Sequence, residues 1–149
     1  MPFCLTTGCR LAKGIGEKLS PAPCLPPCAI AVVKPKFSIS TKRLYEKIDS
    51  VPLRHRPDTK AMLDALARKD LEGVCRSLGN VMEEAAVQDR PMIDQIRQAL
   101  LQGGALGARM TGSGSAVYGI FAGEEAAKRG LDALAGLPVQ TWVARPVGE

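Results

Sequence analysis

The sequence predicts an α+β fold in which helices pack on one face of an antiparallel sheet. Three observations lead to this prediction. An apolar run near residue 30 is bounded by prolines, as expected of a buried strand. The middle of the chain repeats apolar residues at spacings of three and four, which is the period of a helix that buries one face. The last third returns to short extended runs with one helical stretch between them.

The first 33 residues are predicted to be mainly extended. Residues 1–5 have the composition of a strand or a buried turn, and residues 10–19 are predicted to form two short extended pieces around a glycine-rich turn. Four prolines within residues 20–28 exclude a helix or a central strand, because proline has no amide hydrogen to donate. This segment is therefore predicted to be a surface connector, and residues 29–33 a buried strand.

The middle of the chain is predicted to be helical. A first short helix begins at Ser40 or Thr41, whose hydroxyl can accept a free amide hydrogen, and runs to about Lys47. Pro91 suits the first turn of the last of these helices, which ends at Gly103. The apolar stripes are Met62, Leu63, Leu66 and Ala67; Leu71, Val74, Cys75, Leu78, Val81, Met82 and Ala85; and Met92, Ile93, Ile96, Ala99 and Leu100. We interpret these stripes as core faces, since every soluble helix must bury one.

Strands return after the helices. Residues 105–110 and 116–121 are predicted to be two short strands on either side of a Gly-rich turn. A helix follows over residues 124–135, and residues 139–144 alternate apolar with polar as a closing strand. Trp142 in this last strand is expected to pack on the sheet.

Length and charge exclude several classes of protein. A chain of 149 residues makes one domain, or a domain with a small appendage. The net charge of +5, from 20 Lys and Arg against 15 Asp and Glu, permits an anionic ligand but does not demand nucleic acid. No run approaches the roughly 18 consecutive apolar residues of a membrane helix. We therefore expect neither a nucleic-acid partner nor a membrane partner.

The cysteines indicate a reducing compartment. They are odd in number and show no repeated spacing, unlike an extracellular disulfide framework, so a cytoplasmic location is expected: Cys4, Cys9, Cys24, Cys28 and Cys75. A zinc site at Cys24 and Cys28 would need a second pair of ligands, and the single histidine, His55, lies in a charged loop. The neighbouring Glu83 and Glu84 diverge by about 100° on a helix and do not make a Mg²⁺ pair. No metal site is predicted.

Residues 109–117, RMTGSGSAV, are the strongest chemical signal in the chain. Glycines permit positive φ, and successive amides with the hydroxyls of Thr111, Ser113 and Ser115 could cradle an anion. The same composition suits a strand–turn–strand hairpin, and the residues alone leave both interpretations open. The segment lacks the lysine of a Walker A loop.

The segment GARMTGSGSAVYGIF resembles the third, C-terminal Gly-rich motif of the GHMP kinase superfamily. Two further segments, PFCL…AKGIGEKL over residues 2–19 and KPKFSISTKRLY over residues 34–45, resemble the 4-diphosphocytidyl-2-C-methyl-D-erythritol kinases within it. The similarity runs from Pro2 to about Val143. It implies a ferredoxin-like GHMP kinase C-terminal domain over residues 29–149. Residues 1–28 would then be remnant strands and a Pro-rich connector from the first kinase domain.

The resemblance also implies a function. Such kinases transfer the γ-phosphoryl of ATP to the 2-hydroxyl of a cytidine-containing substrate, in non-mevalonate isoprenoid precursor synthesis. They are about twice this length or slightly less. Their nucleotide loop and catalytic aspartate precede the region that aligns here, so we expect a C-terminal portion with no catalytic residue. The isolated chain is expected to be inactive. ATP and Mg²⁺ would serve the full-length enzyme, without tight binding to this chain alone.

Site residues follow from the same resemblance. Ile15, Thr41 and Tyr45 match positions that line the substrate pocket. The ring of Tyr45 would lie against the cytosine, although it could equally be a half-buried helix residue. The Gly-rich motif would buttress the phosphate-binding region of the other half; its members are Thr111, Gly112, Ser113, Gly114 and Ser115.

Partners and alternatives complete the expectations. The missing N-terminal half is one expected partner, and self-association through an apolar patch at Phe3, Leu5 and Leu11 is another. A stand-alone α+β module that binds a small ligand without catalysis is an alternative function. Another GHMP kinase, acting on homoserine or mevalonate, is a second alternative. The segments KPKFSISTKRLY and AKGIGEKL count against that second alternative.

Overall fold

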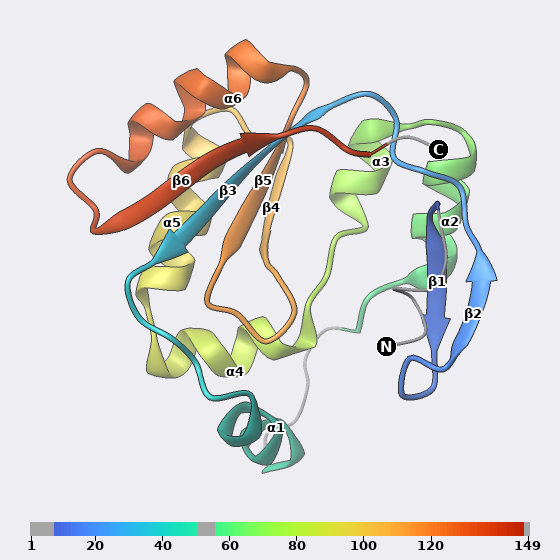
Figure 1. Ribbon diagram of the computed structural model, residues 1–149, viewed down its shortest axis with the longest axis horizontal. Helices are drawn as coiled ribbons and strands as arrows, with labels where there is room; N and C mark the ends of the chain where they lie inside the picture. The colour runs from blue at the N-terminus through green and yellow to red at the C-terminus, as the bar shows by residue number, and fades with distance from the viewer. Residues whose placement is uncertain (1–7, 51–55, 148–149) are drawn as a thin grey trace.

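A computed structural model of the chain describes residues 8–50 and 56–147 (Figure 1). The strands are β1 (Arg10–Lys13), β2 (Lys18–Pro21), β3 (Ala29–Pro35), β4 (Gly107–Met110), β5 (Val117–Phe121) and β6 (Val139–Ala144). The helices are α1 (Thr41–Ser50), α2 (Thr59–Ala67), α3 (Leu71–Arg76), α4 (Val81–Asp89), α5 (Met92–Gln102) and α6 (Glu124–Leu131), with the 3₁₀ turn η2 (Asp132–Leu134) after α6. The predicted α+β class, an antiparallel sheet with helices, is confirmed.

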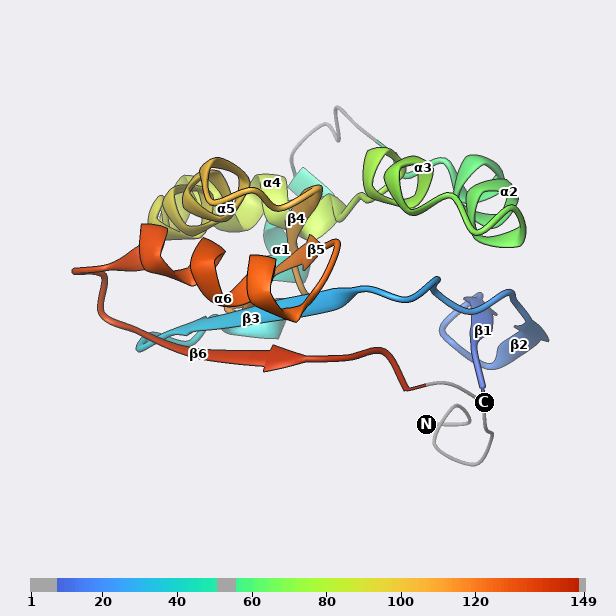
Figure 2. The same cartoon turned by 90° about the horizontal axis from the view of Figure 1, so that it is seen from above.

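The main sheet has the order β4-β5-β3-β6, and every neighbouring pair is antiparallel. The central strand β3 alternates in burial, with Ala29, Ala31 and Val33 on its buried face, because successive side chains of a strand point to opposite sides. Figure 2 shows α5 and α6 together on one side of β3 and β6. The core lies between this face and the apolar faces of the helices, where Ile93, Ile96, Leu100 and Phe121 are fully buried.

The C-terminal end of α5, at Gly103, and the end of α6, at Gly130, pack backbone against backbone. A Cβ on Gly130 would overlap the ring of the buried Phe121 and would lie 2.9 Å from the carbonyl oxygen of Gly103. The backbones are therefore close enough that only glycine fits at this crossing.

Gly130→Ala is expected to lower the free energy of unfolding by about 1–3 kcal/mol, because the added methyl group overpacks the core. The loss would occur although alanine is the better helix former by about 1 kcal/mol. Arg129→Ala, an exposed neighbour on the same helix, is the control and should change stability by less than about 0.5 kcal/mol. Urea denaturation of the three proteins makes the comparison. An unchanged midpoint for Gly130→Ala would contradict the crossing described here.

The hairpin of β1 and β2 forms a separate two-stranded sheet, which lies apart from the main sheet in Figures 1 and 2. Its tip turns at Gly14 and Gly16, which have φ of +70° and +98°. The carboxylate of Glu17 accepts a hydrogen bond of 2.7 Å from the amide of Ile15 and so holds the tip. The two extended pieces predicted around these glycines are confirmed.

Several predicted elements differ in extent from the observed ones. Strand β3 continues to Pro35 because Lys34 and Pro35 pair with Gln140 and Val139 of β6. Helix α1 continues from the predicted end at Lys47 to Ser50. The apolar stripe predicted over residues 71–85 is divided between α3 and α4, which are separated by residues 77–80.

Trp142 was expected to pack on the sheet, and this expectation is wrong. It lies opposite Val32, on the face that α5 and α6 do not cover, and 51% of its surface is exposed. Strand β6 is an edge strand, so the indole has a neighbour on one side only. The expectations for residues 1–5, including Phe3 and Leu5, and for His55 lie outside the described residues. Across residues 8–50 and 56–147, no helix combines the length and the apolar character needed to cross a bilayer.

Candidate functional site

The Gly-rich loop, defined as residues Thr111–Ser115, joins β4 to β5 as a hairpin turn. The amide of Thr111 donates to the carbonyl of Ala116 at 2.9 Å, and the amide of Gly114 donates to the carbonyl of Thr111 at 2.8 Å. Gly112 and Gly114 have φ of +46° and +85°, which is the region that favours glycine. The predicted hairpin is therefore confirmed, and the anion cradle stays a prediction.

The segment after β3 holds the Gly-rich loop from one side. Ser115 is buried, and its hydroxyl donates to the carbonyl of Phe37 at 2.6 Å. The ammonium of Lys34 donates to Ser115 Oγ at 3.0 Å and to the carbonyls of Phe37 and Pro35, each at 2.9 Å. An ammonium has three hydrogens, so all the donors of Lys34 are used within the protein. Ser115 and Lys34 thus fasten two loops together, and neither presents a free polar group to a ligand.

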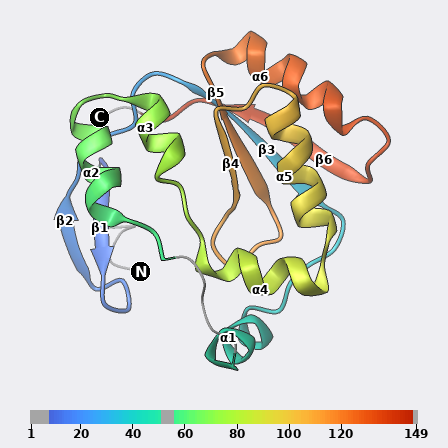
Figure 3. The same cartoon turned by 180° about the vertical axis from the view of Figure 1, so that it is seen from behind.

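Two predicted site residues meet at the same place. The hydroxyl oxygens of Thr41 and Ser113 lie 2.9 Å apart, although the residues are 72 positions apart in the sequence. Thr41 is the first residue of α1, so the hydrogen bond joins the start of this helix to the middle of the Gly-rich loop. Tyr45 lies one turn further along α1, and 55% of its surface is exposed. Ile15 is 98% exposed at the hairpin tip, and Figures 1–3 place the hairpin apart from α1.

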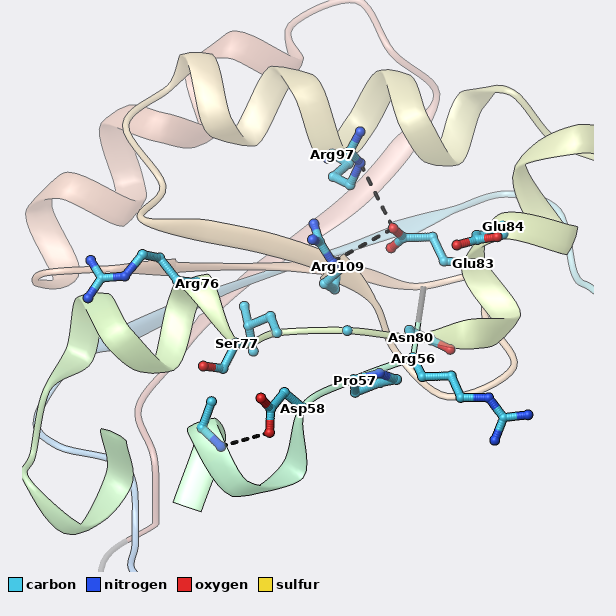
Figure 4. A pocket seen from close by; sticks show the side chains of 13 residues that line it. Arg56, Pro57, Asp58, Arg76, Ser77, Asn80, Glu83, Glu84, Arg97 and Arg109 are labelled. Carbon is cyan, nitrogen blue, oxygen red and sulfur yellow. Dashed lines mark hydrogen bonds and ion pairs between the residues drawn. The ribbon is translucent and has the colours of Figure 1, made fainter. Parts of the chain in front are cut away.

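Helix α4 holds the Gly-rich loop from the other side through Asn80 and Glu83, whose side chains are drawn in Figure 4. Asn80 caps this helix by accepting a hydrogen bond from the amide of Met82 at 2.9 Å. Its side-chain amide donates to the carbonyls of Met110 at 2.7 Å and Gly112 at 2.8 Å. The carboxylate of Glu83 accepts a hydrogen bond of 2.6 Å from the amide of Met110. The sequence reasoning missed this pair, although Asn80 followed by Glu83 has the spacing of a helix capping box.

A cleft of about 560 Å³ opens beside this contact, between the starts of α2 and α4 and the end of α3. Its charged walls are Arg56, Asp58, Arg76, Glu83, Glu84, Arg97 and Arg109. Guanidinium nitrogens of Arg97 and Arg109 each lie 4.0 Å from Glu83, and Arg97 also bonds to Asp94 at 2.6 Å. Four arginines and three carboxylates line the opening, so the cleft carries no strong field of one sign.

Burial shifts the pKa values of three side chains near this region. It raises the pKa of Cys75 to about 11, with a further rise from the neighbouring Cys28, and it also raises the pKa of Cys28. Burial likewise raises the pKa of Tyr118, which lies opposite Arg109 in β5, so its hydroxyl stays protonated at neutral pH. Residues 8–50 and 56–147 contain no group of three His, Cys, Asp or Glu side chains that could hold a metal ion.

The two buried thiols are expected to resist alkylation. At pH 8 in excess iodoacetamide, Cys28 and Cys75 of the native protein should react at least about ten times more slowly than the half-exposed Cys24, because the thiolate is the nucleophile. Peptide mass spectrometry of timed samples measures each rate. In urea the three rates should converge. Native Cys75 reacting as fast as Cys24 would contradict the burial described here.

At this site the Gly-rich loop can offer a ligand its backbone amides rather than its side chains. Thr111 and Gly112 are exposed, and the amides of Gly112 and Ser113 donate to no atom of residues 8–50 or 56–147. These amides are available to an oxyanion, while the hydroxyls of Ser113 and Ser115 are bonded to Thr41 and to the carbonyl of Phe37. The contacting carboxylate, Glu83, is engaged by an amide and two arginines and is not free to take a proton from a substrate.

The family model described as GHMP kinases C terminal matches residues 62–138, from α2 to the end of the turn before β6. This span includes α4, the Gly-rich loop and the helix pair α5 and α6. The chain belongs to the GHMP kinases and contains their C-terminal domain.

Named relatives narrow the comparison. The 4-diphosphocytidyl-2-C-methyl-D-erythritol kinase of Lachnospira eligens is 41% identical over 125 residues, which cover 84% of this chain and 43% of that protein. The kinase of the same name from Listeria monocytogenes is 36% identical over 147 residues, which cover 99% of this chain and 50% of that protein. The chain therefore spans about half the length of the curated relatives it matches.

Solved structures agree on the fold. A crystal structure of a 4-(cytidine 5'-diphospho)-2C-methyl-D-erythritol kinase superimposes with a TM-score of 0.75 at 31% identity, covering 94% of this chain and 50% of that chain. A homoserine kinase from Cytophaga hutchinsonii has a TM-score of 0.73 at 18% identity, covering 93% of this chain and 47% of that chain. The second likeness shows the fold alone.

Proposed function

We propose that the chain supplies the C-terminal half of a 4-diphosphocytidyl-2-C-methyl-D-erythritol kinase. The complete enzyme would transfer the γ-phosphoryl of ATP to the 2-hydroxyl of this substrate, in non-mevalonate isoprenoid precursor synthesis. The observation that carries the proposal is the identity of 35–41% to kinases of this name over most of the chain. Homoserine kinases, the alternative with a similar fold, are similar at 18% and 21% identity.

The contact between Thr41 and Ser113 supports a division of labour within this half. In the proposal, α1 faces the substrate and the Gly-rich loop faces the phosphates, so one hydrogen bond joins the two sides. The exposed ring of Tyr45 would stack on the cytosine, since a flat π surface suits a base. Ile15 keeps its predicted place on the cytidine side of the substrate pocket: it is exposed at the tip of the hairpin, although the hairpin lies apart from α1.

The other half would supply the remaining chemistry. We propose that residues 1–28 belong structurally with the first kinase domain and residues 29–149 form the second, in agreement with the separate sheet of β1 and β2. The catalytic aspartate and the nucleotide loop would come from the first domain, so the chain alone would be inactive. Phosphoryl transfer is mainly positioning and electrostatic stabilisation, which two halves can share.

ATP and Mg²⁺ belong to the complete enzyme in this proposal. The free amides of Gly112 and Ser113 are suited to a phosphate oxygen, and the described residues offer no cluster of metal ligands. The expected setting is the cytoplasm, and the expected partner is the N-terminal half, with self-association as the second possibility.

ADP release tests the proposal. The chain alone, with ATP, Mg²⁺ and the cytidylated methylerythritol, should show no turnover above background. Addition of the separately produced N-terminal half of the Listeria monocytogenes relative should restore substrate-dependent ADP release. Turnover by the chain alone would refute the assignment of the base and nucleotide loop to the other half. If the chain binds the substrate and forms a complex with the N-terminal half, but the complex releases no ADP, the result would favour the stand-alone binding module without catalysis.

A further inference from the structure

We infer that the first turn of α4, through Asn80 and Glu83, is the device that positions the Gly-rich loop. This inference concerns how the loop is held, and its catalytic consequence rests on the proposed function. Both residues line the cleft, but their polar groups are already occupied by contacts to Met110, before the loop, and to Gly112, within it. They are therefore positioning residues.

The geometry follows from the place of β4 at the edge of the sheet. The amide and the carbonyl of Met110 face away from β5, and an edge strand normally leaves such groups unpaired. Glu83 accepts from this amide at 2.6 Å and Asn80 donates to this carbonyl at 2.7 Å. The two side chains thus do what a fifth strand would do at this position. Asn80 also bonds to the carbonyl of Gly112 at 2.8 Å, which extends the contact into the loop.

The charges around Glu83 fix it in this role. Its side chain is 14% exposed and lies between the guanidiniums of Arg97 and Arg109, each at 4.0 Å. Arg97 is itself held by two hydrogen bonds to Asp94, at 2.9 and 2.6 Å. A hydrogen bond from an amide to a carboxylate is stronger than one between two neutral groups. Figure 4 shows the arginines and Glu83 converging above Asn80.

The loop is consequently held at both ends. On the side of α1, Lys34 bonds to Ser115 and Thr41 bonds to Ser113. On the side of α4, Asn80 bonds to Gly112 and Glu83 bonds to Met110. Removal of the α4 contacts frees one end without touching the other. A displacement of about 1 Å at a reacting site can cost about 100-fold in rate. The expected signature is a lower kcat with an unchanged KM, because neither residue touches substrate.

Amide hydrogen exchange by NMR on the 149-residue chain tests the inference without any need for catalysis. Glu83→Ala should speed exchange of the Met110 amide by at least about tenfold, because its acceptor is lost. Glu83→Gln keeps an acceptor oxygen and should retain most of the protection. Asn80→Ala should shift the resonances of residues 111–113 while leaving those of β6 in place. Glu72→Ala, an exposed glutamate on α3, is the matched control and should change neither.

The outcomes are distinct. Unchanged exchange of Met110 in a folded Glu83→Ala protein, or equal acceleration in Glu72→Ala, would overturn the inference. If Glu83→Ala does not fold, Asn80→Ala decides: unchanged resonances for residues 111–113 in a folded Asn80→Ala protein would overturn it. In the kinase completed with the N-terminal half, kcat should fall about 10- to 100-fold for Glu83→Ala, with KM within about twofold. An inactive wild-type kinase alongside a positive exchange result would count against the proposed function and leave the positioning role standing.

Discussion

Gly114→Ala is expected to reduce turnover of the completed kinase by at least about 100-fold. Gly114 has φ of +85°, a conformation that costs a side chain about 1–2 kcal/mol. A Cβ would also lie 2.7 Å from Met110 Sδ and 2.9 Å from Ile39 Cδ1, so the ends of these two side chains or the loop must shift to admit it. A shift of the loop would fall in the part that the proposed function turns toward the phosphates. Steady-state ADP release and thermal unfolding together measure the effect.

Gly112→Ala is the matched control for this substitution. Its φ is +46°, but a Cβ there would meet no atom within 4 Å. Gly112→Ala should lower the free energy of unfolding by about 1–2 kcal/mol, because the backbone conformation disfavours a side chain, but it should not displace the loop. Its turnover should therefore fall much less than that of Gly114→Ala. Equal losses of turnover in the two variants, or full activity in Gly114→Ala, would contradict the packing of the loop against Met110 and Ile39.

The second large effect is expected at Tyr45. Tyr45→Ala should raise KM for the cytidylated substrate by about 10- to 100-fold, because stacking of a base on an aromatic ring contributes about 1–3 kcal/mol. Tyr45→Phe keeps the ring and should stay within about threefold of wild type. Stability should change little, because the ring is 55% exposed. Initial rates over a range of substrate concentrations separate KM from kcat.

Trp142→Ala serves as the control for Tyr45, since Trp142 is a second half-exposed aromatic, in β6 rather than α1. It should leave KM unchanged. An unchanged KM in Tyr45→Ala would remove Tyr45 from the substrate pocket and favour its interpretation as an ordinary helix residue. A raised KM in Trp142→Ala would show that the effect does not depend on α1.

Local patterns were sufficient to predict most of the fold. Pro91 and Gly103 bound α5 as their backbone chemistry requires, and the proline-bounded apolar run is the central strand β3. The errors lie where tertiary context decides. Trp142 has the composition of a packed strand residue but lies on an edge strand. The stripe over residues 71–85 keeps helical spacing across a break at residues 77–80, and Asn80 in this break bonds to the edge strand β4.

The site was predictable only in part. The resemblance named the Gly-rich loop and Thr41, and the structure adds the hydrogen bond between Thr41 and Ser113. Nothing in the sequence reveals that contact, since the two residues are 72 positions apart. Lys34 and Glu83 were missed as part of the site for the same reason. Their partners, Ser115 and Met110, belong to a hairpin that is distant in the sequence. The residue type of a lysine or a glutamate does not by itself indicate that it supports a loop.

The central claim is that this chain is the C-terminal half of a kinase for a cytidylated methylerythritol. It is tested most directly by a chimera in which the N-terminal half of the Listeria monocytogenes relative precedes this chain. After incubation with ATP and Mg²⁺, ³¹P NMR of the product should show a new phosphomonoester on the 2-hydroxyl of 4-diphosphocytidyl-2-C-methyl-D-erythritol. The intact relative provides the positive control, and the chimera carrying Gly114→Ala provides the negative one. A chimera that folds and binds ATP but forms no such ester, or that phosphorylates homoserine or mevalonate instead, would contradict the claim.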